Sequence, residues 1–217
     1  MAGDLAPVER RGAPLTRSDL AGPPELVAPL LLGALLVVER GGRRRAGRIV
    51  EVEAYGGDDD PASHAHGGER PRNRSMFAEP GVLYVYRSYG IHACANVVTG
   101  EPGVGAAVLV RAVSPVSGIE EMRAARPAAR TDLQLTSGPG RLCQALGITL
   151  GDDGVDLFDP AAPVRLEGAV GPAGEVSVSG RVGISRETER PWRFWLTGDP
   201  YVSRHRPGAR AGREGTR

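Results

Sequence analysis

The chain has 217 residues, a formal net charge of +1 and 41% hydrophobic residues. These values fit one folded domain and exclude a protein that attracts nucleic acid through bulk positive charge. The richest apolar run, Leu26–Val38, is broken by Pro29 and Gly33 and is shorter than the roughly 20 residues that cross a bilayer. Because the N-terminus also lacks the basic-then-apolar order of a secretory signal, we expect a cytoplasmic protein with no membrane partner.

The composition also limits the chemistry. All 27 basic residues are arginine, so no lysine is present to form a Schiff base or to act as a general base. The two cysteines, Cys94 and Cys143, are too few for a zinc cluster and are read as buried thiols. We therefore expect no metal and no cofactor.

The first half of the chain is predicted to hold a helix and a hairpin. Residues 1–16 are polar and rich in proline and glycine, which predicts a disordered arm. The apolar spacing of Pro23–Leu36 predicts a helix whose first turn tolerates the proline pair. Strands over Leu35–Glu39 and Arg48–Tyr55 are expected to form a hairpin that turns at Gly41 and Gly42.

Strands and short helices alternate in the rest of the chain. Strands are predicted over Val82–Tyr86, Ile91–Val98 and Gly105–Val113. Ser117, with Glu120 at capping-box spacing, and Ser137 are predicted to cap helices, the second of which ends at Gly147. Four short strands follow, at Val164–Glu167, Glu175–Val178, Gly180–Ile184 and Trp192–Leu196. No linker divides the chain, so residues 17–203 are predicted to form one domain, and residues 204–217 a flexible basic tail.

Two glutamates mark the strand Arg48–Tyr55. Alternation places Glu51, Glu53 and Tyr55 on one face of that strand. The pattern fits a solvated face as well as a site, and it does not distinguish the two acids. A long polar loop follows this strand, and loops of such length are usually functional or disordered.

The long loop carries several candidate ligands. Asp60, His64 and His66 leave a metal-dependent hydrolase open, although their spacing matches no specific zinc pattern. Three arginines of the same loop fit contacts to phosphates, and equally a plain solvated loop. They are Arg70, Arg72 and Arg74.

Three of the five tyrosines lie in the stretch LYVYRSYG, residues 83–90. Tyr84 and Tyr86 share a strand face, where ordinary packing accounts for Tyr84. Tyr89 falls on the turn, where an aromatic ring buries little and is free to enter another molecule. A pocket walled by Tyr55 and Tyr86 suits a nucleobase, since stacking contributes roughly 1–3 kcal/mol per base.

Six ordered stretches between Pro14 and Ser203 carry a more specific signal: RIVEVEAY, PRNRSMF, LYVYRSYGIHACAN, VLVRAV, SGPGRLCQALGI and RVGI with RPWRFW. Together they resemble the alkyladenine (3-methyladenine) DNA glycosylase family. The resemblance implies an α+β domain with a curved, mostly antiparallel and partly barrel-like sheet flanked by a few helices. It also implies a monomeric enzyme that flips alkylated or deaminated purines out of double-stranded DNA.

The resemblance assigns roles to single residues. Glu53 matches the acid that activates the attacking water, which Arg111 and the backbone carbonyl of Val182 help to hold. The other matches concern the damaged base and the duplex. Tyr55 matches the residue on one face of the flipped base, and His64 and Tyr86 match the residues on the other face. Asn96 matches the residue that excludes guanine. Tyr89 matches the wedge that enters the minor groove.

Two further expectations follow. A chain without lysine predicts a monofunctional glycosylase that leaves an abasic site, because strand-cutting glycosylases use an amine. The alternative is a non-catalytic protein that binds damaged DNA through the same pocket. Glu53 and Arg111 argue against that alternative, since a binder needs no carboxylate near an anionic backbone.

Overall fold

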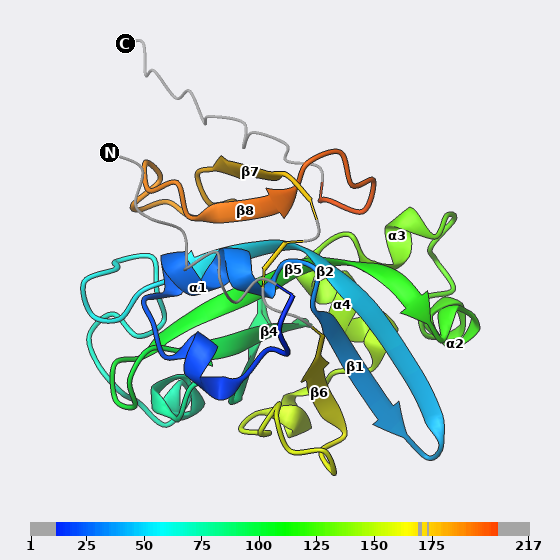
Figure 1. Cartoon of the computed structure of the whole chain (residues 1–217), viewed down its shortest axis with the longest axis horizontal. Helices are drawn as coiled ribbons and strands as arrows, with labels where there is room; N and C mark the ends of the chain where they lie inside the picture. Colours follow the sequence, from blue (N-terminus) through cyan, green and yellow to red (C-terminus); the bar gives the residue numbers. More distant parts are fainter. Residues whose placement is uncertain (1–11, 169–170, 173, 204–217) are drawn as a thin grey trace, which may run out of the picture.

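Antiparallel strands form one curled sheet that organises the chain. The computed structural model describes residues 12–168, 171–172 and 174–203 (Figure 1). Within them, the sheet has eight strands. Six pair in the order β3-β4-β5-β2-β1-β6, β8 pairs with β2, and β7 pairs with β8. The sheet curls into a half-barrel. The strands are β1 Leu35–Arg40, β2 Arg43–Tyr55, β3 Leu83–Ser88, β4 His92–Thr99, β5 Ala106–Ser117, β6 Val164–Glu167, β7 Val176–Ser179 and β8 Arg193–Leu196.

Short helices cover parts of this sheet. Helix α1 packs on β2, and α4 packs on β4 and β5. The α-helices are α1 Pro24–Leu31, α2 Ile119–Ala125, α3 Leu133–Thr136 and α4 Pro139–Leu146, and single 3-10 turns occupy η2 Arg17–Leu20, η3 Arg74–Phe77 and η4 Leu150–Asp152. This arrangement confirms the predicted α+β class and the single curved, mostly antiparallel sheet.

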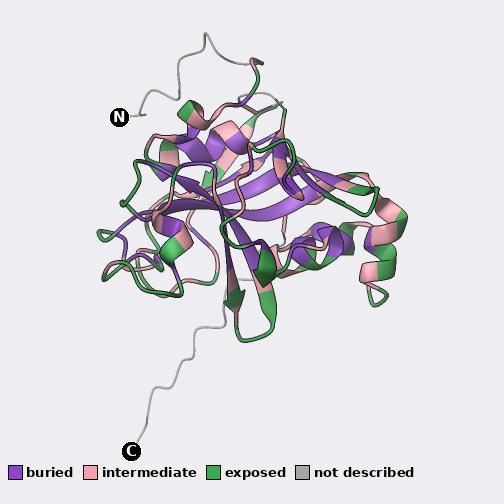
Figure 2. Cartoon of the chain, turned by 90° about the horizontal axis from the view of Figure 1, so that it is seen from below, coloured by how far each residue is buried: buried purple, intermediate pink, exposed green. Residues whose placement is uncertain are grey.

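Strand β2 is the central element of the sheet, because it pairs with β1, β5 and β8. Its apolar residues Val50 and Val52 are fully buried in the main core. Glu51 and Glu53 alternate with them and are equally buried. The strand is therefore covered on both faces, and Figure 2 shows the buried interior of the sheet with exposure concentrated in loops and strand ends.

The predicted first helix is too long. Helix α1 ends at Leu31, and the chain turns through Gly33, whose φ of 94° suits glycine. Leu35 and Leu36 belong to β1 instead. The hairpin is confirmed, but β2 begins at Arg43, directly after the Gly41-Gly42 turn.

Both predicted serine caps are wrong. Ser117 ends β5, and Gly118 precedes α2 with a φ of 74° at a position where a Cβ would lie 2.6 Å from the Arg44 carbonyl oxygen. Gly138, not Ser137, precedes α4. The predicted stop at Gly147 is confirmed by its φ of 84° and by the hydrogen bond from its N–H to the Cys143 carbonyl.

The later strands are confirmed with small shifts, except for one. The predicted strand Gly180–Ile184 is irregular chain, and this segment reaches a buried site described below. At the N-terminal end, Leu15 is buried and its N–H donates to the Gly168 carbonyl, so packed chain begins before residue 17. Residues 1–11 of the predicted arm and the predicted tail 204–217 lie outside the described residues. None of the helices described here is long and apolar enough to cross a membrane.

Candidate active site

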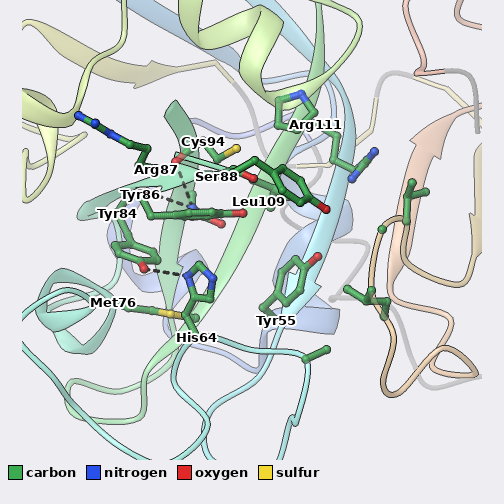
Figure 3. A pocket seen from close by; sticks show the side chains of 17 residues that line it. Tyr55, His64, Met76, Tyr84, Tyr86, Arg87, Ser88, Cys94, Leu109 and Arg111 are labelled. Carbon is green, nitrogen blue, oxygen red and sulfur yellow. Dashed lines mark hydrogen bonds between the residues drawn. The ribbon is translucent and has the colours of Figure 1, made fainter. Parts of the chain in front are cut away.

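A cavity of about 450 Å³ opens beside the β3–β4 hairpin (Figure 3). This volume is within the range of small-ligand sites. Strands β2, β3, β4 and β5 supply most of its lining. The rest comes from the long loop after β2, the tip of the β3–β4 hairpin, the start of α4 and the irregular segment after β7. The lining includes Tyr55, His64, Met76, Tyr84, Tyr86, Cys94, Asn96, Leu109, Arg111 and Val182.

Glu53 lies directly behind this lining and is fully buried. Its Oε2 accepts hydrogen bonds from Arg111 Nη1 and from the Tyr55 hydroxyl, both at 3.0 Å. Its Oε1 accepts one from the backbone N–H of Val182 at 2.6 Å. All three donors line the cavity, so the carboxylate is held at the cavity wall by the residues that form it.

Glu51 has a different environment from Glu53, although both extend from the same face of β2. Its carboxylate accepts hydrogen bonds from Arg111 Nε at 2.9 Å, Arg193 Nε at 2.7 Å and the Ser203 N–H at 2.6 Å. Burial disfavours the charged form of Glu51, but these donors outweigh it and lower the pKa. Arg111 is the one donor to Glu51 named above that lines the cavity, whereas all three donors to Glu53 line it.

Arg111 joins the two carboxylates. Its side chain is 9% exposed, and its guanidinium contacts Glu51 through Nε and Glu53 through Nη1. Burial opposes its charge, but Glu53 and Glu51 together raise the pKa of Arg111. The planar fork of arginine fixes the direction of both contacts, which a flexible ammonium would not do.

Tyr55 forms one side of the cavity, and its outer face packs on an arginine. The guanidinium carbon of Arg181 lies 4.7 Å from the Tyr55 ring centroid. Burial and the charge of Glu53 raise the pKa of Tyr55 well above its usual value, so its hydroxyl remains a donor to Glu53 at neutral pH. The ring is therefore fixed by contacts at its edge and behind it.

Asp60 holds Arg181 in that position. The two side chains are fully buried and joined by bonds of 2.5 and 2.9 Å, and Asp60 also accepts from the N–H groups of Gly56 and Ala62. The structure therefore does not bring Asp60 and the two loop histidines together as metal ligands. His66 Nδ1 donates to the Asp58 carbonyl, and the part of the chain described contains no cluster of three metal-ligating side chains.

His64, Tyr84 and Tyr86 face Tyr55 across the cavity (Figure 3). The His64 ring meets the Tyr86 ring edge-on at a centroid distance of 4.3 Å, and its Nδ1 is 3.0 Å from the Tyr84 hydroxyl. Tyr84 is 2% exposed, as the packing role predicted for it requires. Burial, with a contribution from Arg72, lowers the pKa of His64, so its imidazole is neutral at pH 7.

Asn96 lies in the floor of the cavity and is 4% exposed. Its Nδ2 donates to the Tyr84 carbonyl at 3.1 Å. This bond fixes the orientation of the amide, so the residue is a rigid part of the floor.

Two apolar side chains project from the tip of the β3–β4 hairpin. Tyr89 is 89% exposed and Ile91 is 75% exposed. Tyr89 and Gly90 both have positive φ, 49° and 74°, and the Ile91 N–H donates to the Ser88 carbonyl. These features define a type I′ turn. A tight turn with both side chains in solvent forms a rigid, apolar projection at the cavity rim.

Comparison with known proteins identifies the family. A sequence model of the methylpurine-DNA glycosylase family matches residues 18–200. A Nocardia farcinica protein is 51% identical over 199 residues, which cover 89% of this chain and 92% of that protein. The chain belongs to the methylpurine-DNA glycosylase family. A Burkholderia lata protein is 46% identical over 203 residues, 93% of this chain and 96% of its own, and a Mycobacterium bovis protein is 45% identical over 202 residues, 91% and 97%. All three carry the provisional name 3-methyladenine DNA glycosylase.

In this glycosylase, most residues singled out from the sequence gather at one cavity. Tyr55, Arg111 and Val182 line it with His64, Tyr86, Asn96 and Tyr89, and Glu53 lies behind the first three. The loop arginines Arg70, Arg72 and Arg74 are exposed and are not part of the lining.

Several supporting residues were not foreseen from the sequence. They include Arg181, Arg193 and Ser203, which lie far from β2 along the chain but hold Tyr55, Glu51 and Arg111. Asn73 is another, because its buried amide donates to the His64 carbonyl and fixes the long loop. Only the density of arginines near residues 181–193 hints at this network, and no spacing rule connects them to β2.

The buried Asp60–Arg181 pair predicts that part of the free energy of unfolding is lost at acid pH. Burial opposes the charge of Asp60, but Arg181 and two backbone N–H groups lower its pKa overall. A lowered folded-state pKa stabilises the fold above the unfolded pKa of about 3.9, and this stabilisation is lost as the pH falls through the folded value. Asp60→Asn leaves Arg181 buried without its partner and should cost about 3–5 kcal/mol at pH 7.

Urea unfolding of the wild type and Asp60→Asn at a series of pH values tests this prediction. The difference should shrink as the pH falls below about 4. Asp59→Asn is the matched control, because the neighbouring Asp59 side chain is 81% exposed. A pH-independent difference, or an equal effect of Asp59→Asn, would show that the buried ion pair is not its cause.

Proposed function

We propose that this glycosylase releases alkylated or deaminated purines of the 3-methyladenine class from double-stranded DNA. The damaged nucleotide turns into the cavity, and a water activated by Glu53 hydrolyses the N-glycosidic bond and leaves an abasic site. The observation that carries the proposal is the placement of Glu53, a buried carboxylate whose three donors all line one cavity. The names of the three relatives specify 3-methyladenine, which supports the same lesion class.

The hydrogen bonds of Glu53 leave room for a water. A carboxylate oxygen accepts about two hydrogen bonds. Among the described residues, Oε2 accepts two and Oε1 accepts one, from Val182. A water bound to Oε1 would lie beside the Val182 backbone, whose carbonyl is a further acceptor for it. Arg111 places a positive charge 3.0 Å from the other carboxylate oxygen and leaves Oε1 to the water.

The walls of the cavity suit a flat cationic base. A purine alkylated at a ring nitrogen carries positive charge, which makes it a good leaving group and an electrostatic partner for aromatic faces. Tyr55 would stack on one side of the base, with His64 and Tyr86 on the other. His64 is neutral at pH 7, so it would not repel a cation, and one ring nitrogen remains to contact the base edge.

Asn96 would supply selection against normal guanine. The amide is held by its bond to the Tyr84 carbonyl and has no room to withdraw from the floor. A purine with an exocyclic 2-amino group would meet this fixed side chain. Extrusion itself adds a second filter, since a poorly paired base costs less to flip.

Tyr89 would enter the duplex where the nucleotide has left it. An inserted apolar side chain offsets part of the unstacking cost. The rigid type I′ turn and the exposure of the ring support this role. Arg70, Arg72 and Arg74 on the neighbouring loop would contact phosphates, and the enzyme would act as a monomer.

The absence of lysine leads us to propose base release without strand cleavage. A strand-cutting glycosylase forms a Schiff base through an amine, and the sequence offers no lysine for it. Borohydride treatment during turnover should therefore trap no covalent protein–DNA adduct. Recovery of such an adduct would contradict the proposal.

Substitution of Glu53 tests the catalytic role. Glu53→Gln keeps the shape of the side chain but removes the base, so single-turnover base release from a lesion duplex should fall by about 10²–10⁴-fold. Affinity for a duplex with an abasic site should stay within a few fold of wild type. Glu120→Gln is the matched control, because that side chain is 81% exposed on α2. Undiminished release by Glu53→Gln would remove Glu53 from its role.

Substitution of Tyr89 tests the wedge. Tyr89→Ala should slow base release from a paired lesion by about tenfold or more, since stacking contributes roughly 1–3 kcal/mol. The loss should be smaller when the lesion is mispaired and already poorly stacked. Val116→Ala, at an exposed apolar position outside the cavity lining, should change neither rate. Equal losses on paired and mispaired lesions would contradict insertion.

A further inference from the structure

A second cavity lies beside the β3–β4 hairpin and has no part in the chemistry proposed for Glu53. It is an open groove of about 820 Å³ between the hairpin tip, helix α4 and the chain that follows α4. We call it the hairpin–α4 groove. Its lining includes Ile91, His92, Gly140, Gln144 and Leu150. Arg87 lines both this groove and the base cavity, so the two hollows meet at the hairpin.

We propose that the hairpin–α4 groove binds the sugar–phosphate backbone of the DNA strand opposite the damaged base. This inference rests on the proposed function, because it assumes that the hairpin tip enters a duplex. It assigns a partner to a surface that the reaction at Glu53 leaves unused.

The arrangement of the hairpin is the first argument. Tyr84 and Tyr86 point into the base cavity, whereas Ala93, on the opposite face of the hairpin, lines only the groove, and Arg87 lines both hollows. Tyr89 and Ile91 project from the tip that separates the two hollows. If the strand with the flipped nucleotide lies on the base-cavity side of the tip, the opposite strand is left on the groove side.

The charges of the groove are the second argument. Arg87 and His92 supply its basic side chains, and none of the described lining residues is an aspartate or a glutamate. The nearest carboxylates along the chain are engaged elsewhere, Asp152 with Arg40 and Asp153 with Ser75 and the Val85 N–H. An anionic backbone would therefore meet no opposing charge in the lining.

The shape and stiffness of the groove are the third argument. Gly90, Gly140, Gly147 and Gly151 contribute no side chains, so a DNA backbone can approach the main chain closely. The hairpin also packs tightly on α4, since a Cβ at Gly140 would lie 2.9 Å from the His92 side chain. The groove is thus a fixed surface with few polar side chains, which suits contact with a backbone more than readout of bases.

Leu150 offers a sensitive probe of the groove. It is 38% exposed at the first position of η4 in the groove wall. Leu133 is 39% exposed at the first position of α3 and lines neither cavity. Leu150→Arg should tighten binding to a duplex with a stable abasic-site analogue by about threefold more than Leu133→Arg does. The Leu133 variant measures the general effect of one added positive charge.

The strand is identified by removing phosphate charge from the DNA. Uncharged methylphosphonates are placed in one strand at a time, near the lesion or opposite it. The additional affinity of Leu150→Arg over Leu133→Arg should disappear when methylphosphonates replace phosphates in the opposite strand. It should persist when they replace phosphates in the lesion strand. The proposal would be overturned if the additional affinity disappeared when the lesion strand was neutralised instead. It would also be overturned if both variants gained the same affinity for unmodified DNA. Base release by the wild type is measured in parallel, so failure of the proposed function is recognised separately.

Discussion

The bridge that Arg111 forms between Glu51 and Glu53 is the interaction on which the site depends. Two carboxylates buried on one face of a strand would repel each other and lose their hydration, at a cost of several kcal/mol per ion. Arg111 offsets that cost with one contact to each acid, and Arg193 balances the second negative charge. Ser203 completes the set with two bonds to Glu51. Glu53 is therefore held in the interior beside a positive charge.

A second buried pair links the two loops that complete the cavity. Asp60 belongs to the long loop after β2, and Arg181 precedes Val182 in the irregular segment after β7. Their contact places Val182 against Glu53 and packs Arg181 behind Tyr55. The fully buried charge pair thus joins the two loops, and Arg181 also donates to the Ala54 carbonyl of β2. The cavity therefore keeps its shape although much of its wall is not regular secondary structure.

Local patterns predicted the frame of the site but not its supports. Alternation correctly placed Glu51, Glu53 and Tyr55 on one face, yet it could not distinguish the two acids, because that depends on Arg193 and Ser203 some 140–150 residues later. The tight turn at Tyr89 was predictable from its glycine and its flanking strands. The residues that precede the helices were not predictable. At Gly118, the close approach of the Arg44 carbonyl leaves no room for a side chain, so glycine stands where a capping serine was expected. Distant contacts of this kind leave no spacing signal in a single sequence.

A crystal structure of the Glu53→Gln variant bound to a duplex with one damaged purine tests the central claim most directly. The account predicts that the base lies between Tyr55 and the pair His64 and Tyr86, with its sugar C1′ facing side chain 53 across one water. A damaged base bound at another surface, with this cavity empty and the side chain at position 53 still enclosed away from the sugar, would contradict it.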